Sequence, residues 1–185
     1  MLKIETERLI LREPTMGDFA FLKSLWEDGR VMHYVGFPNG LKQSDEKIVK
    51  WINTAQMNRN CKLVIEDKES GKTIGETGYR LDLDYPHAHD RKSAAPDIKL
   101  IPEFWGKGLA TEAFEVVIDY IFKNTDVEVI QVSPNIKNLA ALKIYEKLGF
   151  KKVGDPITES SNTKQKTTPQ VQNDITNQYM EMVRE

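Results

Sequence analysis

The sequence has one cysteine, no long hydrophobic run and no excess of positive charge. Because Cys61 is alone, no intramolecular disulfide can form, which excludes a small scaffold held together by disulfides. No apolar run approaches the roughly 20 residues that span a bilayer. Residues 1–13 are charged throughout, unlike the apolar core of a signal peptide. We therefore expect a cytoplasmic protein with no membrane partner.

The charge balance also argues against a nucleic-acid partner. The chain has 26 Lys and Arg against 28 Asp and Glu, a net charge of −2, whereas nucleic-acid-binding domains usually carry a marked basic excess. Hydrophobic residues make up 39% of the chain, which is enough for a core, and 185 residues suit a single domain. We expect one domain over residues 1–185.

Hydrophobic periodicity and turn residues predict alternating strands and helices. Strands are predicted at 6–13, 61–67, 73–84, 95–101, 127–132, 150–156 and 175–183, and helices at 14–27, 44–57, 108–123 and 137–148. Loops are expected at 29–40, 85–93 and 158–174, and a hairpin turn with Gly71 at 68–72. Because hairpins alternate with helical crossovers, the order predicts an α/β fold: a mixed sheet with helices on its faces.

A glycine-rich segment lies between the fourth predicted strand and the long helix. The first amides of a helix lack intrahelical acceptors, the helix dipole is positive there, and glycines let the backbone approach a bulky anion. A diphosphate is the natural ligand, and the alternative is a simple strand-to-helix turn. Neither the P-loop nor the dinucleotide pattern fits, because Gly106-Lys107 precedes Gly108 and no third glycine follows. The segment is Trp105, Gly106, Lys107, Gly108, Leu109 and Ala110.

Three stretches together resemble the GNAT superfamily of acetyltransferases, most closely the branch that includes the ribosomal-protein N-terminal (alanine) acetyltransferases. They are TERLILRE at 6–13, LIPEFWGKGLATEAF at 100–114 and SPNIKNLAALKIYEKLGF at 133–150. The resemblance covers nearly the whole chain. It implies a single GNAT-type domain, with a mostly antiparallel sheet of about seven strands flanked by about four helices, and acetyl-CoA as co-substrate.

The resemblance also implies where acetyl-CoA binds. The pyrophosphate lies on residues 105–110 and the helix start through Thr111, while the backbone of Leu100 and Ile101 hydrogen-bonds the pantetheine arm. Trp105 stands where the superfamily pattern has Gln or Arg, which leaves the phosphate contact to backbone amides and Lys107.

Asn138 and Tyr145 form a second candidate site. They are two helical turns apart, roughly 10 Å along one face, and the small Ala141 between them leaves room for a slender ligand. The resemblance implies that Asn138 contacts the pantetheine arm and that Tyr145 protonates the departing thiolate. The alternatives are a helix cap for Asn138 and a core aromatic above Phe150 for Tyr145.

The general base is the weakest part of the pattern. Acetyl transfer needs a neutral amine, and many family members use a glutamate at the position occupied here by Ala95. Asp97, two residues on and on the same strand face, is our candidate, with Glu76 as a second one. Both could instead be ordinary solvated or ion-paired carboxylates, since Lys99 shares the face of Asp97. A third alternative is that positioning of the amine replaces a base.

The remaining cysteine, histidine and aromatic residues are not expected to take part in the chemistry. Cys61 is not expected to act as a nucleophile. No metal is expected, because a loop with two histidines and one aspartate lacks a further ligand (His87, His89 and Asp90). Three residues of the 29–40 loop could frame the acceptor pocket or only pack that loop onto the sheet (His33, Tyr34 and Phe37).

These features predict an N-acetyltransferase that transfers the acetyl group directly to a primary amine, either a protein N-terminus or a small amine. The expected partners are acetyl-CoA and the acceptor, with a second copy of the chain as a further candidate. The alternative is a non-catalytic acyl-CoA-binding module, which the alanine at position 95 would suit.

Overall fold

The computed structural model describes residues 2–56, 60–81, 91–159 and 175–184. Eight strands form the main sheet; in spatial order they are β1 (Lys3–Glu5), β2 (Leu9–Arg12), β3 (Asn60–Asp67), β4 (Lys72–Leu81), β5 (Ser93–Leu100), β6 (Val129–Val132), β10 (Met180–Val183) and β7 (Lys151–Lys152). All neighbours are antiparallel except β5 and β6, which are parallel. A separate ribbon joins β8 (Ile157–Glu159) to β9 (Ile175–Asn177).

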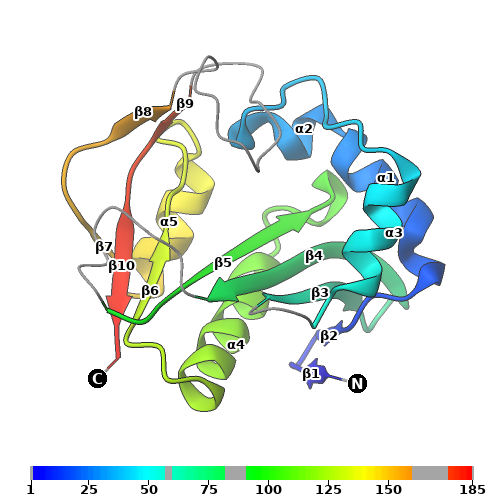
Figure 1. Cartoon of the computed structure of the whole chain (residues 1–185), viewed down its shortest axis with the longest axis horizontal. Coiled ribbons are helices and arrows are strands. Elements are labelled where there is room, and N and C mark those ends of the chain that lie inside the picture. Colours follow the sequence, from blue (N-terminus) through cyan, green and yellow to red (C-terminus); the bar gives the residue numbers. More distant parts are fainter. Residues whose placement is uncertain (1, 57–59, 82–90, 160–174, 185) are drawn as a thin grey trace.

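Helices cover both faces of the sheet (Figure 1). They are α1 (Phe19–Glu27), α2 (Gly29–Met32), α3 (Asp45–Asn53), α4 (Leu109–Asn124) and α5 (Leu139–Lys147), with short 3-10 turns η1 (Met16–Asp18), η2 (His33–Val35) and η3 (Pro102–Phe104). The mixed, mostly antiparallel α/β architecture confirms the fold expected from the sequence. Among the described residues, no helix has both the length and the apolar character needed to cross a bilayer.

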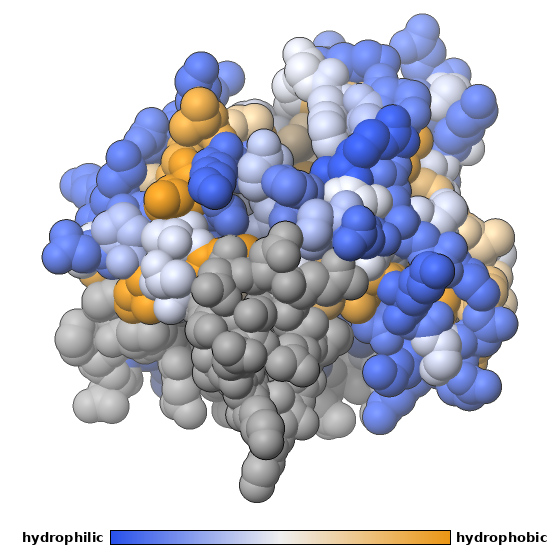
Figure 2. Space-filling model, turned by 90° about the horizontal axis from the view of Figure 1, so that it is seen from above, coloured by the Kyte–Doolittle hydropathy of each residue, from blue (hydrophilic) through white to orange (hydrophobic). Residues whose placement is uncertain are grey.

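Two hydrophobic clusters hold the layers together, because β3 buries side chains on both faces. Leu63 and Ile65 face the α4 side, where Phe114 is completely buried, while Val64 faces the opposite side. That second cluster joins β3 to α1 and α3 through residues such as Ile48. The face in Figure 2 is mostly hydrophilic, with its hydrophobic side chains in separate patches. The two-sided burial fixes β3 and β4 at the centre of the molecule.

Several predicted local features are confirmed. Thr15 and Asp18 form a capping box: the Thr15 amide donates to Asp18 Oδ2 at 2.8 Å and its hydroxyl contacts the same oxygen at 3.0 Å. The β3–β4 hairpin turns at Gly71, which has a φ of 66°. The long helix begins one residue after Gly108.

Residues 29–40 are not simply a loop, as the sequence suggested. They contain α2 and η2, and the Asp28 side chain caps α2 by accepting from the Arg30 amide at 2.8 Å. Only a glycine fits at position 29, since the Pro38 backbone packs against it and a β-carbon would lie 2.2 Å from the Pro38 carbonyl oxygen.

Four predicted strand or helix boundaries were wrong. The first strand is only β2, and a separate β1 pairs with it. The strand at 150–156 is reduced to β7, because the chain turns at Gly154 with a φ of 62°. The last strand is broken into β9 and β10, because the Gln178 amide donates to Pro134 instead. The second helix ends at Asn53 rather than near residue 57. Residues 82–90 and 160–174, predicted mainly as loops, lie outside the described residues.

Candidate active site

The strands β5 and β6 separate soon after they meet. Their parallel pairing covers only Ser93 with Val129 and Ala94 with Ile130, and β6 then pairs with β10 on its other side. Among the described residues, no strand pairs with the rest of this β5 edge, which continues to Leu100. The sheet therefore opens into a gap between two adjacent strands.

Hydrogen-bond alternation shows which β5 groups face this gap. The Ile101 amide donates to the Ile74 carbonyl oxygen on the β4 side at 2.9 Å. Successive residues of an antiparallel strand alternate, so the amides of Leu100 and Ile98 point to the open edge. The Leu100 carbonyl faces the same way and accepts from the Trp105 indole at 2.7 Å. Of the two backbone positions expected to hold a ligand, the Leu100 amide remains suitable, whereas the Ile101 amide is used within the sheet.

The glycine loop (residues 105–108) leads directly into α4. Gly106 and Gly108 have φ values of 73° and 78°, a left-handed conformation that favours glycine. Gly108 is the N-cap and provides no side-chain cap, so the first amides of α4, at Leu109, Ala110 and Thr111, receive no side-chain acceptor there. Residues 105–108 are exposed. The loop therefore has the geometry of an anion site on a helix N-terminus.

Arg8 fixes the position of this loop, a role that the sequence did not reveal. Its guanidinium donates to the Lys107 carbonyl oxygen at 2.9 Å and to Glu112 Oε2 at 2.7 Å. Burial raises the pKa of Glu112, but hydrogen bonds from Thr6 and Arg8 outweigh it and lower that pKa overall. The acid in the first turn of α4 is thus neutralised by Arg8, which leaves the helix end receptive to an anion.

A cavity of about 740 Å³ lies where the sheet opens. Its walls come from α5, from the chain after β6, from β3, β4 and β5, and from the α1–α3 side. Asp97, Asn138 and Tyr145 line it, together with Ala141. The glycine loop does not line the cavity, so the predicted residues form two neighbouring parts of one site: an anion site on α4 and a cavity beyond the β5 edge.

Two carboxylates and a lysine lie together on one face of β4 and β5. Glu76 is 5% exposed, and its Oε1 accepts from the Trp26 indole at 2.9 Å and contacts Lys99 Nζ at 3.0 Å. Lys99 also contacts Asp97 Oδ2 at 2.7 Å, although 66% of the Asp97 side chain is exposed. Burial lowers the pKa of Lys99, but these two carboxylates outweigh it and raise that pKa overall. Lys99 therefore stays cationic, and both acids are ion-paired, as the sequence-based alternative stated.

Tyr145 packs on the core and also faces the cavity. Its ring lies 5.2 Å from that of Phe114 and 5.6 Å from that of Phe150, so it packs on the core. It is only half-buried and also lines the cavity. Asn138 caps α5, because its Oδ1 accepts from the Ala141 amide at 3.1 Å, and it lines the same wall. Packing and capping therefore hold both side chains in place at the cavity.

The other candidate residues differ in whether they line the cavity. Phe37 is buried in the second cluster, whereas Tyr34 lines the cavity with the His33 ring 5.0 Å away. Cys61 is buried, and burial raises the pKa of its thiol, which does not suit a nucleophile. Within the described part of the chain, no three His, Cys, Asp or Glu side chains gather as metal ligands. The predicted weak group His87, His89 and Asp90 lies outside it.

Comparison with known proteins identifies the family. The model of the acetyltransferase (GNAT) domain matches residues 8–151. The chain belongs to the GNAT acetyltransferase family. It is 29% identical over 157 residues to the uncharacterized N-acetyltransferase YoaA of Bacillus subtilis, covering 82% of this chain and 84% of the relative. The family makes the chain an acetyl-CoA-dependent N-acetyltransferase.

Solved GNAT structures share this fold. The spermidine N-acetyltransferase of Vibrio cholerae, in complex with CoA and spermine, superposes with a TM-score of 0.73, 23% identity and 96% coverage of each chain. The ribosomal-protein alpha-N-acetyltransferase RimL, in complex with coenzyme A, also gives a TM-score of 0.73, with 13% identity and 98% coverage of each chain.

The described residues of this GNAT chain fit acetyl-CoA. A diphosphate suits the uncapped α4 amides behind two left-handed glycines, and an extended arm suits the open β5 edge. Ala95, where many family members have glutamate, is 7% exposed on β5 and lines the cavity. Sequence reasoning missed Trp26 and Arg8 as parts of the site, whereas the strand alternation around Asp97 pointed to Lys99 as its ion-pair partner.

Proposed function

We propose that this GNAT enzyme acetylates a primary amine, on a small molecule or a protein N-terminus, within the 740 Å³ cavity. The observation that carries the proposal is that one cavity has Tyr145 on its α5 wall and Asp97 on its β5 wall. These residue types supply a proton donor and a proton acceptor on opposite sides of the β5–β6 gap.

The chain's own groups would bind acetyl-CoA in one orientation. The amides of Leu109, Ala110 and Thr111 and the Lys107 ammonium suit its diphosphate. The backbone N–H groups of Ile98 and Leu100 are placed to donate hydrogen bonds to the carbonyl oxygens of its pantetheine arm. Bound acetyl-CoA supplies an acetyl group on a thioester. This placement directs the thioester toward the cavity between α5 and β5.

In the proposed reaction, Asp97 takes a proton from the substrate amine and Tyr145 gives one to the leaving thiolate. The substrate ammonium gives one proton to Asp97, and the neutral nitrogen forms the new N–C bond as the C–S bond breaks. Tyr145 gives its phenolic proton to the departing sulfur and regains one from the nitrogen through solvent. Lys99, which also contacts Glu76 Oε1, lies 2.7 Å from Asp97 Oδ2 and holds that carboxylate in place. Because Asp97 is exposed, it can pass its proton to water.

The proposal is tested by mixing the enzyme and acetyl-CoA with a panel of primary amines and of short peptides with free N-termini. Thiol release and mass spectrometry of the products are measured together. We expect amine-dependent thiol release with one acetyl group added per nitrogen. Tight acetyl-CoA binding without any acetylated amine would instead support a non-catalytic acyl-CoA-binding module.

We also infer a cytoplasmic location. Cys61 is the only cysteine and is buried as a free thiol, which is compatible with a reducing compartment. Fractionation of cells that express the tagged chain tests this inference.

A further inference from the structure

The sheet has a bare patch at the floor of the cavity, centred on Gly78. On the face toward α1 and α3, Gly78 lies between Lys62 of β3 and Asp97 of β5, which are its direct cross-strand partners. A side chain at Gly78 is excluded, because a β-carbon would lie 2.1 Å from the Cys61 carbonyl oxygen. Gly78 itself lines the cavity, so this part of the sheet is accessible to a ligand and flanked by opposite charges.

The neighbouring residues on β4 extend this polarity. Glu76 and Arg80 lie two residues either side of Gly78 and share its face, each roughly 7 Å away along the strand. Arg80 pairs with the small, buried Ala95 on β5, so no large side chain covers the sheet beside it. All five positions that frame the patch line the cavity: Lys62, Glu76, Arg80, Ala95 and Asp97.

The cations at the patch are less well neutralised than the acids. Both carboxylates are engaged by Lys99. Lys62, by contrast, donates to neutral oxygens, the Trp51 carbonyl at 3.3 Å and Thr54 Oγ1 at 3.0 Å. Burial is the main cause that lowers the pKa of Lys62, and the attraction of the Glu76 carboxylate does not outweigh it. An anion beside Lys62 would counter that burial and stabilise its charged form.

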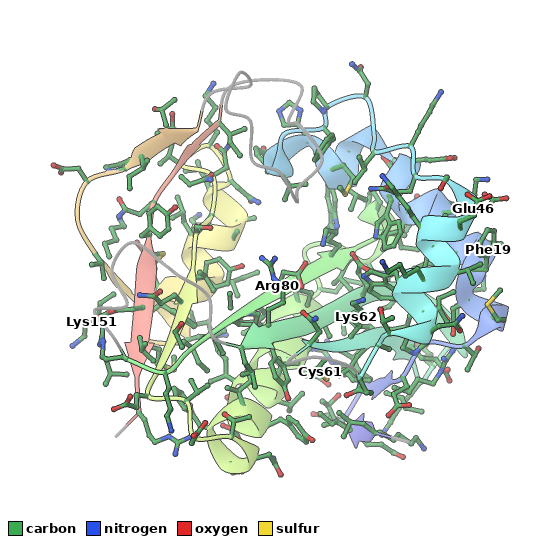
Figure 3. The ribbon with its side chains drawn as sticks, in the orientation of Figure 1. Phe19, Glu46, Cys61, Lys62, Arg80 and Lys151 are labelled. Atoms are coloured by element: carbon green, nitrogen blue, oxygen red, sulfur yellow. The ribbon has the colours of Figure 1, made fainter. Side chains whose placement is uncertain are left out.

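Arg80 and Lys47 add to the excess of positive charge in the cavity lining. Arg80 is exposed, and neither residue forms an ion pair with another part of the described chain. The described lining of the cavity therefore holds four Lys or Arg side chains against two carboxylates. Figure 3 shows Arg80 near the centre of the molecule and Lys62 closer to α3.

We propose that the acceptor is an amine that also carries a carboxylate. Its ammonium group lies toward Asp97, and its carboxylate lies toward Arg80 and Lys62. This inference rests on the proposed amine acetylation and specifies its substrate class. A polycationic amine would place a second positive charge against Arg80 and Lys62, whereas a carboxylate gains charge-assisted hydrogen bonds there.

Three acceptors of equal length test this proposal: 4-aminobutanoate, butylamine and 1,4-diaminobutane, which differ only in the charge of the far end. We measure kcat/KM for each with saturating acetyl-CoA. The carboxylate should raise kcat/KM roughly 10- to 100-fold over butylamine, and the diamine should fall below butylamine. Equal values, or a preference for the diamine, would overturn the proposal.

Variants locate the effect. Arg80→Gln and Lys62→Met should each reduce the ratio of 4-aminobutanoate to butylamine, and Arg80→Glu should reverse the preference toward the diamine. Because these are ratios, they are insensitive to a loss of folded enzyme. Lys151→Met is the matched control, since Lys151 is exposed on β7 and does not line the cavity. A ratio that survives Arg80→Glu would also overturn the assignment.

A binding measurement separates this inference from the proposed function. The affinity of the three amines for the enzyme saturated with CoA is measured by calorimetry. If no amine is acetylated but 4-aminobutanoate binds in an Arg80-dependent manner, the anion site stands and the acetylation proposal fails. If the amines are acetylated without any carboxylate preference, acetylation stands and the anion site fails. If none binds or reacts, both are overturned.

Discussion

The Trp26 indole donates a hydrogen bond of 2.9 Å to Glu76 Oε1, which ties α1 to β4 inside the protein. Both residues are buried, and Glu76 Oε2 has no hydrogen-bond partner among the described residues. An acid with one unsatisfied oxygen depends strongly on its remaining partners, here Trp26 and Lys99. The pair therefore links the position of α1 to the charge of the site.

Replacement of this buried charge should lower both stability and activity. In Glu76→Gln, Lys99 loses one of the two carboxylates that raise its pKa and would face an amide donor or a weaker acceptor. We expect a loss of about 1–3 kcal/mol in the free energy of unfolding. Urea denaturation measures it, and kcat should fall because Lys99 no longer holds Asp97 in the same way.

Trp26→Phe is the companion variant. It keeps the apolar packing of Trp26 but removes the indole donor, so it should destabilise the fold through Glu76 without changing the charge near Asp97. An unchanged unfolding midpoint in both variants would show that Glu76 contributes no stability through these contacts.

Tyr145→Phe should slow acetyl transfer while leaving the fold intact. The phenyl ring keeps its contacts with Phe114 and Phe150, but the proton donor to the leaving sulfur is gone. A general acid typically contributes about 10²- to 10⁴-fold, so we expect kcat to fall by at least about 10²-fold. The KM for acetyl-CoA should change little, and steady-state thiol release measures both constants.

Tyr120→Phe is the matched control, since Tyr120 is a half-buried tyrosine on α4 whose ring lies near Tyr79. It should retain normal kcat. Full activity in Tyr145→Phe would remove the general-acid role and leave Tyr145 as a packing residue.

Local features of the fold could be predicted from the sequence where they depend on nearby residues. The Thr15–Asp18 capping box and the Gly71 turn each involve residues within a few positions of one another. The long helix was predicted from the spacing of its apolar residues. By contrast, β1 is a short charged strand, Lys3–Glu5, that is held by distant residues: it pairs with β2, and Glu5 forms an ion pair with Lys68. Nothing within its three residues predicts that pairing.

The site was predictable in part for the same reason. The glycine loop and Tyr145 belong to short motifs, so the sequence located them. Arg8 and Glu112 are 104 positions apart and meet only once α4 has packed against β2. Likewise, the contact of Trp26 with Glu76 needs the placement of α1 on the sheet. Such contacts depend on tertiary structure that no local pattern records.

Gly108→Ala should weaken acetyl-CoA binding. An alanine at a φ of 78° costs about 1–2 kcal/mol, so the loop should leave the backbone conformation that presents the first amides of α4, and the methyl group would lie 3.6 Å from the Arg8 guanidinium that positions the loop. We expect the KM for acetyl-CoA to rise about tenfold, with a smaller change in kcat at saturation. Initial rates over a range of acetyl-CoA concentrations measure both.

Gly71→Ala separates strain from binding. Gly71 has a similar φ of 66° and nothing within 4 Å of its β position, but it lies in the β3–β4 turn. It should lower stability to a similar degree and leave the KM for acetyl-CoA unchanged. An equal rise of KM in both variants would mean that general destabilisation, not the anion site, causes the effect.

Asp18 should make stability depend on pH in the acid range. Burial raises the pKa of Asp18, but the Arg12 guanidinium, with contacts of 2.9 Å to each carboxylate oxygen, and Thr15 outweigh it and lower that pKa overall. A carboxyl group with a lowered folded-state pKa stabilises the fold fully above its unfolded pKa of about 3.9. That contribution is lost as pH falls through the folded-state value.

The difference between the wild type and Asp18→Asn isolates this contribution from other acids. At pH 7 the variant leaves Arg12 with only the Glu66 carboxylate, at 3.1 Å, and should lose about 1–3 kcal/mol of stability. As pH falls from about 3.9 through the lower folded-state pKa, the two proteins should converge, because Asp18 itself then becomes neutral. Asp119→Asn, which removes an exposed pair with Lys123, should show little change at either pH. A constant difference between wild type and Asp18→Asn from pH 7 to pH 2.5 in urea denaturation would contradict an ionic role for Asp18.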